Sequence, residues 1–263
     1  MCRWVAYIGE KASPYQFLYE EEHSLIKQSL DARKCKSPVN GDGFGIGWYG
    51  DKREPGLYRD IQPAWSDENL RSLCYQMSSS LFMAHVRAST GTATMRGNCH
   101  PFRHENCLFM HNGQIGEYMK IRRELESLLD DKLYNSRFGS TDSEIIFLYL
   151  LQLGAMEDFH GALEQMITNV TAIMSKAGIR EAFRCTACFS NGEKIWAARF
   201  STDSIVPSLY LEKRPCGFLL VSEPLNDMST EWCIIEENHS MVLDWRRGAS
   251  SMRRIESIKA CVA

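Results

Sequence analysis

The stretch FRCTACFS (183–190), NG (191–192) and EKIWAARF (193–200) contains two apolar runs on either side of a turn dipeptide. Asn-Gly between two such runs is a strong hairpin signal, because both residues tolerate the positive φ angles of a tight turn. An antiparallel pair of strands is therefore predicted at 183–190 and 193–200. Three shorter strands are predicted further along the chain, near 208–211, 217–222 and 241–243.

Strands are also predicted in the N-terminal half, at 2–8, 81–87 and 107–115. Another is expected in the second half of the run GDGFGIGWYG (41–50), which holds five glycines. A nucleotide-binding loop is disfavoured there, because prolines and a glycine interrupt 51–63, where the required helix would lie. The glycines are interpreted instead as points where packed strands approach closely.

Helices are predicted in two zones that alternate with the strands. The first zone has a helix after Ser13-Pro14, with proline at the first helical position, and another at 66–77. The second zone has a helix that starts within STDSE (140–144), a capping signature, and another at 156–176. This alternation predicts helices packed outside two face-to-face antiparallel sheets, an α+β fold in the form of a four-layer αββα sandwich.

The composition limits the class of protein. At 263 residues and 44% apolar content, without an internal repeat or linker, the chain is expected to form one domain over 2–263. Its net charge of -3 lacks the basic excess of nucleic-acid binders, so nucleic acid is not an expected partner. No stretch approaches the roughly 18 apolar residues of a membrane span. Because 1–10 is also a poor signal peptide, a cytoplasmic protein is expected, with its ten cysteines mostly reduced.

Cys2 is the first candidate for chemistry. Removal of Met1 by an aminopeptidase is expected when the second residue is small, and it leaves Cys2 with a free amine. A thiol is a weak nucleophile at its free pKa, but an α-amino group with a pKa of about 7.7–8.0 accepts the thiol proton at neutral pH. Cys2 would then supply both nucleophile and base. A cysteine at this position also occurs without any function.

Asn112 and Gly113 place a side-chain amide and a glycine N–H side by side, shortly after the apolar run CLFM (107–110). Such a pair can form an oxyanion hole, in which each donor is typically worth a factor of about 10² to 10³ in rate. The alternative is an ordinary Asn-Gly turn.

Two charged residues offer binding groups for an amino-acid substrate. Arg87 ends a predicted strand and enters the polar segment ASTGTAT (88–94), so its guanidinium would clamp a carboxylate beside the hydroxyls of Ser89 and Thr90. A structural ion pair is the alternative. Asp142 lies at a predicted helix start, where a carboxylate either caps the helix or binds an α-ammonium group.

Two cysteine-containing segments are interpreted as structural. The segment NCHPFRHENC (98–107) holds two Cys and two His, but its spacing matches no common structural zinc site and Cys107 begins a buried strand. Cys185 and Cys188 form a CxxC within a predicted strand, where alternation puts the two thiols on opposite faces. No metal and no cofactor is therefore predicted.

Five motifs occur in a fixed order: CR (2–3), AHVRAST (84–90), NCHPF (98–102), HNGQIGEY (111–118) and STDSE (140–144). In this order they resemble the glutaminase domain of class II glutamine amidotransferases, which are N-terminal-nucleophile hydrolases. Together with GDGFG (41–45), SEPL (222–225) and Trp232, they are similar to the stand-alone, YafJ-like branch. That branch is related to ergothioneine-pathway and glutathione-degrading γ-glutamyl amidohydrolases. The resemblance covers nearly the whole chain and implies the αββα sandwich.

The resemblance also implies roles for individual residues. It makes Cys2 the nucleophile with its free amine as base, Asn112 and the Gly113 N–H the oxyanion donors, Arg87 the partner of the α-carboxylate, Asp142 the partner of the α-ammonium, and Thr90 and His100 parts of the pocket lining. This chain departs from larger, synthase-fused relatives at Ala88 and Gly91, where they have tryptophan and histidine.

Three functions follow as hypotheses. The first is hydrolysis of the γ-amide of glutamine through a thioester, which releases glutamate and ammonia. The second keeps the site and replaces glutamine with a γ-glutamyl amide or peptide such as glutathione. The third is a catalytically silent regulatory subunit. Any acceptor of ammonia, or synthase, would belong to a separate partner.

Overall fold

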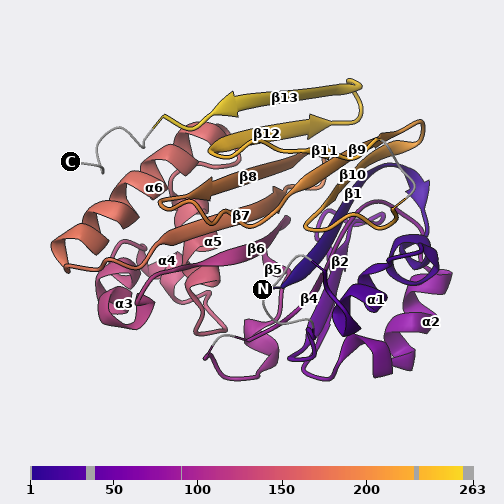
Figure 1. Ribbon diagram of the computed structural model, residues 1–263, viewed down its shortest axis with the longest axis horizontal. Coiled ribbons are helices and arrows are strands. Elements are labelled where there is room, and N and C mark those ends of the chain that lie inside the picture. The colour runs from indigo at the N-terminus through magenta and orange to yellow at the C-terminus, as the bar shows by residue number, and fades with distance from the viewer. Residues whose placement is uncertain (1, 34–38, 90, 228–230, 257–263) are drawn as a thin grey trace.

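The computed structural model describes residues 2–33, 39–89, 91–227 and 231–256, and its strands form two antiparallel sheets that lie face to face (Figure 1). In sheet order, the seven-stranded sheet consists of β11 (Cys233–Ile234), β9 (Tyr210–Arg214), β10 (Gly217–Val221), β1 (Arg3–Ala12), β4 (Ser79–Val86), β2 (Phe44–Trp48) and β3 (Gly56–Asp60). The six-stranded sheet consists of β13 (Ala249–Arg254), β12 (His239–Asp244), β8 (Ile195–Ser201), β7 (Phe183–Ser190), β6 (Cys107–Ile115) and β5 (Phe102–His104).

Helices cover the outer face of each sheet (Figure 1). The seven-stranded sheet carries α1 (Leu25–Leu30), α2 (Glu68–Gln76) and the short turns η1 (Gln16–Glu20) and η2 (Ala64–Ser66). The six-stranded sheet carries α3 (Tyr118–Glu126), α4 (Asp131–Tyr134), α5 (Asp142–Gln152) and α6 (Phe159–Lys176). A further turn, η3 (Arg96–Asn98), precedes β5. The predicted αββα sandwich is thus confirmed.

Three apolar cores separate the four layers. Along β1, Val5 points into the core beneath α1 and α2, whereas its neighbour Trp4 points into the core between the sheets. Successive side chains of a strand alternate between its faces, so one strand serves both cores. On the far side, the ring of Phe147 in α5 packs at a tilt near that of Phe189 in β7, in the third core.

Two of the predicted strands match the structure in both of their bounds. The bounds of β6 and β7 are those expected for 107–115 and 183–190. Cys185 and Cys188 are both buried, the first in the core beneath α5 and α6 and the second between the sheets. Their thiols therefore lie on opposite faces of β7, as alternation predicted, and they cannot form a dithiol pair.

The β7–β8 connection differs from the predicted two-residue turn. Ser190 pairs with Ile195, which leaves a four-residue loop at 191–194. The side chain of Asn191 accepts hydrogen bonds from the backbone N–H groups of Glu193 (3.0 Å) and Lys194 (3.3 Å) and closes this wider loop. The register shifts by two residues, so each side chain keeps its predicted face.

The predicted helix after Ser13-Pro14 is also divided in two. A turn separates η1 from α1, and Ser24 begins the second helix by accepting a hydrogen bond from the N–H of Lys27. Leu25 and Phe17 both remain in the core over the seven-stranded sheet. The apolar spacing thus indicated burial correctly, but the serine cap starts a new helix.

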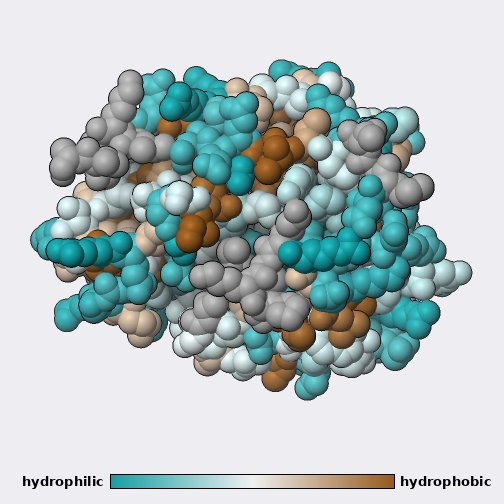
Figure 2. Space-filling view, in the orientation of Figure 1, coloured by the Kyte–Doolittle hydropathy of each residue, from teal (hydrophilic) through white to brown (hydrophobic). Residues whose placement is uncertain are grey.

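The outer surface carries apolar side chains only in small, separate groups on the face that Figure 2 shows. Within the described ranges, none of the helices has both the length and the apolar character that crossing a membrane requires.

Candidate active site

A cavity of about 510 Å³ lies where the start of β1, the end of β4, the last residues of β6 and the start of α5 meet. Six of the predicted site residues line it: Cys2, Arg87, His100, Asn112, Gly113 and Asp142. They come from segments far apart in the sequence. Met1 and Thr90 lie outside the described residues.

The thiol of Cys2 is half-buried beside the chain that leaves β4. Its Sγ accepts a hydrogen bond from the N–H of Ala88 at 3.4 Å and lies 3.6 Å from the Ala88 carbonyl oxygen. Burial raises the pKa of this thiol, while the Ala88 backbone and the positive charges of Arg87 and Arg3 act in the opposite direction. Since the net pKa is raised, the thiol needs a base to become a nucleophile at neutral pH.

The carbonyl oxygen of Cys2 is held by two donors. Asn112 Nδ2 donates to it at 3.0 Å, and Arg3 Nη1 donates to it at 3.0 Å. A carboxamide nitrogen carries two hydrogens, so this bond uses one of the two that Asn112 offers. Asn112 thereby lies against the proposed nucleophile.

Asn112 and Gly113 do not form a turn. They lie within β6, opposite Thr186 and Cys185 of β7. The φ of Gly113 is 149°, and a Cβ at this position would come within 2.0 Å of the Arg184 carbonyl oxygen. Only glycine fits this close approach between β6 and β7.

Arg87 is almost fully buried, with 4% of its surface exposed. Its Nη2 donates to Thr92 Oγ1 at 2.6 Å and lies 3.3 Å from Ser89 Oγ, and its Nη1 donates to the Asp42 carbonyl at 3.2 Å. The guanidinium is therefore positioned by hydrogen bonds to hydroxyl and carbonyl groups, in place of the structural ion pair considered above. Because a guanidinium has five N–H donors, Arg87 can still donate to a further ligand in the cavity.

Asp142 is the first residue of α5, as predicted, but it is not the cap. The side chain of Thr141 takes that role by accepting from the N–H of Glu144. One carboxylate oxygen of Asp142 accepts from the N–H of Ile115 at 2.8 Å, and the other accepts from the N–H of Ser143 at 2.8 Å. The carboxylate thus joins the end of β6 to the start of α5 and still faces the cavity.

Three buried histidines lie beside the cavity. The rings of His85 and His100 are 4.3 Å apart between centroids, and His111 Nδ1 lies 2.8 Å from Ser143 Oγ. Burial lowers the pKa of all three, to about 3 for His85, so they are neutral at neutral pH. The ring nitrogens of His100 have no hydrogen-bond partner among the described residues, and this ring lines the cavity.

The members of the segment 98–107 point to different environments. His100 faces the cavity, whereas Cys107 is packed in the core beneath α5 and α6. Cys99 Sγ lies 3.4 Å from the Asp60 carbonyl oxygen. Across the described part of the chain, no cluster of three or more His, Cys, Asp or Glu side chains is arranged to hold a metal ion.

Sequence reasoning missed several residues near the cavity. His85 and His111 lie inside the motifs AHVR and HNG. Their position within buried strands was the signal that could have identified them as residues near the site. The cavity is also lined by Met119, Lys120, Glu181 and Arg184, which the sequence did not single out, and by Glu117 and Tyr118, to which the motif HNGQIGEY gave no role.

Comparison with known proteins agrees with this geometry. The family model of the class-II glutamine amidotransferases matches residues 19–237. "Probable glutamine amidotransferase DUG3" of Saccharomyces cerevisiae is 39% identical over 160 residues, which are 57% of this chain and 45% of that protein. The γ-glutamyl-hercynylcysteine sulfoxide hydrolase of Mycolicibacterium smegmatis is 25% identical over 91% of this chain and 94% of its own length.

Two solved structures are also similar to this chain. The glutamine aminotransferase class-II domain protein of Silicibacter pomeroyi is 32% identical, with a TM-score of 0.74 over 97% of this chain and 99% of that chain. Glutamine phosphoribosylpyrophosphate amidotransferase of B. subtilis shares the fold at 15% identity, with a TM-score of 0.65 over 97% of this chain and 49% of that chain. Among the relatives compared by sequence, the yeast protein is matched over less than half of its own length.

Proposed function

The chain belongs to the class-II glutamine amidotransferases, a family of amidohydrolases, and from that premise we propose that it cleaves the γ-amide of glutamine with Cys2 as the nucleophile. In this mechanism the α-amino group of Cys2, free once Met1 has been removed, takes the thiol proton. Sγ then attacks the δ-carbonyl carbon. The same amino group returns the proton to the departing ammonia, and water hydrolyses the resulting thioester to glutamate.

The observation that carries this proposal is the shared cavity. Cys2 faces the same space as Asn112, Gly113, Arg87 and Asp142. The second hydrogen of the Asn112 amide, together with the N–H of Gly113, would stabilise the oxyanion. Such donors act most strongly when they are fixed before the reaction, and Asn112 is already fixed on the Cys2 carbonyl.

The two charged residues would recognise the amino-acid end of the substrate. Arg87 would bind the α-carboxylate, for which Ser89 and Thr92 already orient its guanidinium. Asp142 would bind the α-ammonium group while its bonds to Ile115 and Ser143 keep it in place. The neutral ring of His100 would offer a hydrogen bond to either end.

A glutaminase assay tests the proposal. Ammonia release from glutamine is compared for the wild type and for Cys2→Ala, with intact mass used to establish that Met1 is absent from both. We expect loss of turnover in the variant. Undiminished release by Cys2→Ala would exclude the mechanism, and a correctly processed wild type that turned over neither glutamine nor any γ-glutamyl amide would favour a silent regulatory subunit.

The size of the cavity favours a second candidate substrate class. About 510 Å³ is more space than the glutamyl group needs, and Tyr118, Lys120 and Arg184 line the cavity in addition to the residues proposed to hold that group. A γ-glutamyl amide or peptide would place its leaving group there. The relative from Mycolicibacterium is named as a hydrolase of a γ-glutamyl compound.

Substrate comparison separates the two classes. We would measure kcat/KM for glutamine and for γ-glutamyl amides with leaving groups of increasing size. A preference for the larger amides that is lost in Lys120→Ala supports the γ-glutamyl class. A preference for glutamine supports the amidotransferase reaction, in which a separate synthase or acceptor would use the ammonia.

A further inference from the structure

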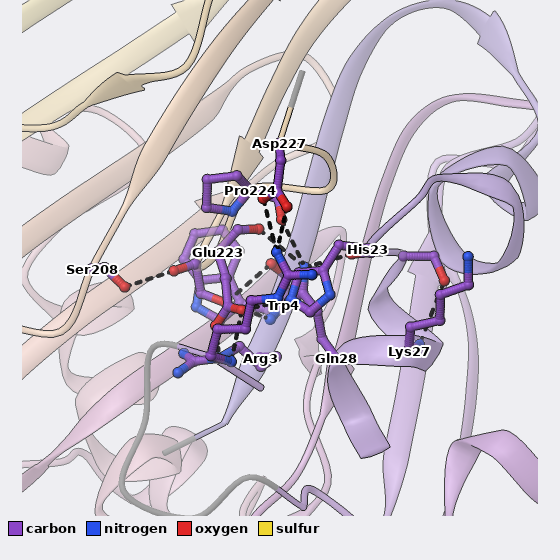
Figure 3. Close-up of polar contacts among 12 residues, drawn as sticks. Arg3, Trp4, His23, Lys27, Gln28, Ser208, Glu223, Pro224 and Asp227 are labelled. Carbon is purple, nitrogen blue, oxygen red and sulfur yellow. Dashed lines mark hydrogen bonds and ion pairs between the residues drawn. The ribbon is translucent and has the colours of Figure 1, made fainter. Parts of the chain in front are cut away.

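Arg3 and Glu223 form a buried ion pair (Figure 3). Arg3 and Glu223 are 0% and 2% exposed, and Arg3 Nε lies 3.0 Å from Glu223 Oε2. Strand alternation puts Arg3 on the same face as Val5, which packs beneath α1 and α2. The pair therefore lies outside the cavity, on the opposite side of β1.

Glu223 is fixed by further contacts from α1 and from the segments on either side of it. His23 Nε2 lies 2.6 Å from Glu223 Oε1, and the N–H of Arg33 donates to the same oxygen at 2.9 Å. Gln28 Nε2 donates to the backbone carbonyls of His23 at 2.9 Å and of Glu223 at 3.2 Å. Figure 3 shows His23, Gln28 and Arg3 gathered around Glu223.

The other end of this network reaches the nucleophile. Arg3 Nη1 donates to the carbonyl oxygen of Cys2 at 3.0 Å. Cys2 precedes β1 and so lies outside the strand. Once Met1 has been removed, the backbone nitrogen of Cys2 is a free amine. The only peptide group that still holds the backbone of Cys2 is then the one that contains its carbonyl. The orientation of both Sγ and amine then depends on that carbonyl.

We propose that Arg3 and Glu223 are positioning residues that fix Cys2 through its carbonyl oxygen, with His23 holding the carboxylate. This inference rests on the proposed role of Cys2. Glu223 orients the guanidinium, the guanidinium holds the Cys2 carbonyl from behind the sheet, and Asn112 holds the same carbonyl from β6. The nucleophile is thus held between its two sheets.

A contribution to folding stability does not by itself account for the buried Arg3–Glu223 ion pair. Replacing a buried ion pair with apolar side chains of similar size often leaves a protein equally stable or makes it more stable. A pair that served only the core could be replaced by apolar residues without effect on turnover. A pair that positions Cys2 could not, because apolar residues have no donor for the carbonyl.

That difference defines the experiment. The double variant Arg3→Met, Glu223→Leu removes both charges together and leaves no unpaired ion in the core. We would measure kcat and KM for glutamine and the thermal unfolding midpoint. We expect a folded protein whose kcat is lower by about 10²-fold, the usual effect of a misplacement of about 1 Å, with KM nearly unchanged. Wild-type kcat in the folded double variant overturns the inference.

Arg3→Lys is the second variant, for use if the double variant does not fold. Lysine keeps the positive charge beside Glu223, but its single ammonium lacks the planar fork with which Arg3 reaches both Glu223 and Cys2. We expect a lower kcat with retained folding. Wild-type kcat in Arg3→Lys overturns the inference.

Arg214→Met is the matched control. Arg214 pairs with Glu21 at 2.9 Å and with Glu212 at 2.7 Å in the same sheet, near the other end of β1. We expect lower stability with unchanged kcat, and a kcat loss equal to that of the Arg3 variants would contradict a specific role. Cys2→Ala separates the two proposals. If it stays active, the proposed function fails; if it is inactive while the double variant is fully active, only the positioning role fails.

Discussion

Substitution of Gly113 by alanine tests the most tightly constrained point of the site. A Cβ on this residue would lie 2.0 Å from the Arg184 carbonyl oxygen and 2.7 Å from His111 Nε2. Real Cβ contacts essentially never fall below 3.0 Å, so β6 and β7 must separate by about 1 Å here. The separation would displace both proposed oxyanion donors from the carbon that Cys2 is proposed to attack.

The expected effects follow from that displacement. A shift of about 1 Å at the reacting groups lowers kcat by about 10²-fold. Overpacking at a buried position typically costs about 1–3 kcal/mol of unfolding free energy. The assays are steady-state ammonia release and urea denaturation, both on protein shown by mass to start at Cys2.

Gly178→Ala provides the matched control. Gly178 also has a positive φ, 68°, but a Cβ there would meet nothing within 4 Å. We expect a small stability loss from backbone strain, about 1–2 kcal/mol, and unchanged kcat. If Gly113→Ala retained wild-type kcat, the close approach of β6 to β7 would be irrelevant to catalysis and the reasoning from geometry would be refuted.

Further predictions concern neighbouring groups. Asn112→Ala should lower kcat by about 10²–10³-fold, since it removes an oxyanion donor and one of the two anchors of the Cys2 carbonyl; a small effect in the glutaminase assay would exclude the amide as a donor. Asp142→Asn should lower kcat/KM by about 10–10²-fold, because a hydrogen bond to a charged group is worth about 1.5–3 kcal/mol, and an unchanged KM would argue against contact with substrate. Burial lowers the pKa of His85 from 6.5 to about 3, so the unfolded chain binds a proton in this pH range that the folded protein does not. Stability should therefore fall with decreasing pH between about 6.5 and 3, by up to about 1.4 kcal/mol per pH unit, and the slope should be smaller in His85→Gln; equal slopes in urea denaturation would contradict this assignment.

The sequence predicted those elements in which consecutive residues form a clear apolar pattern. β6 and β7 are long apolar runs, so their bounds could be read directly, and the Thr141 cap marked the start of α5. β5 has only three residues and β11 only two, which is too short for any periodic signal. The division of η1 from α1 depended on whether Ser24 would cap, and apolar spacing does not determine that.

The candidate site was predictable to the extent that short motifs carried it. The resemblance suggested Cys2, Arg87, Asn112 and Asp142, and their shared cavity agrees with that suggestion. Sequence reasoning gave no indication that Arg3 and Glu223 meet, because nothing in either segment specifies a partner so distant. Such contacts depend on which strands become neighbours, and the strand order depends on the pairing of all strands in the sheet.

The position of β1 has a consequence for how the protein is made. β1 lies between β4 and β10, and the N–H of Trp4 donates to Ser222 Oγ, 218 positions along the chain. During synthesis, β1 is made well before its β10 neighbour, because most of the described chain lies between them. Folding of this sheet therefore waits on contacts between distant segments, which are slow to form. The segment that contains Cys2 therefore stays without its β10 neighbour while the intervening elements are made, and it takes its final place in the sheet only when β10 pairs with β1.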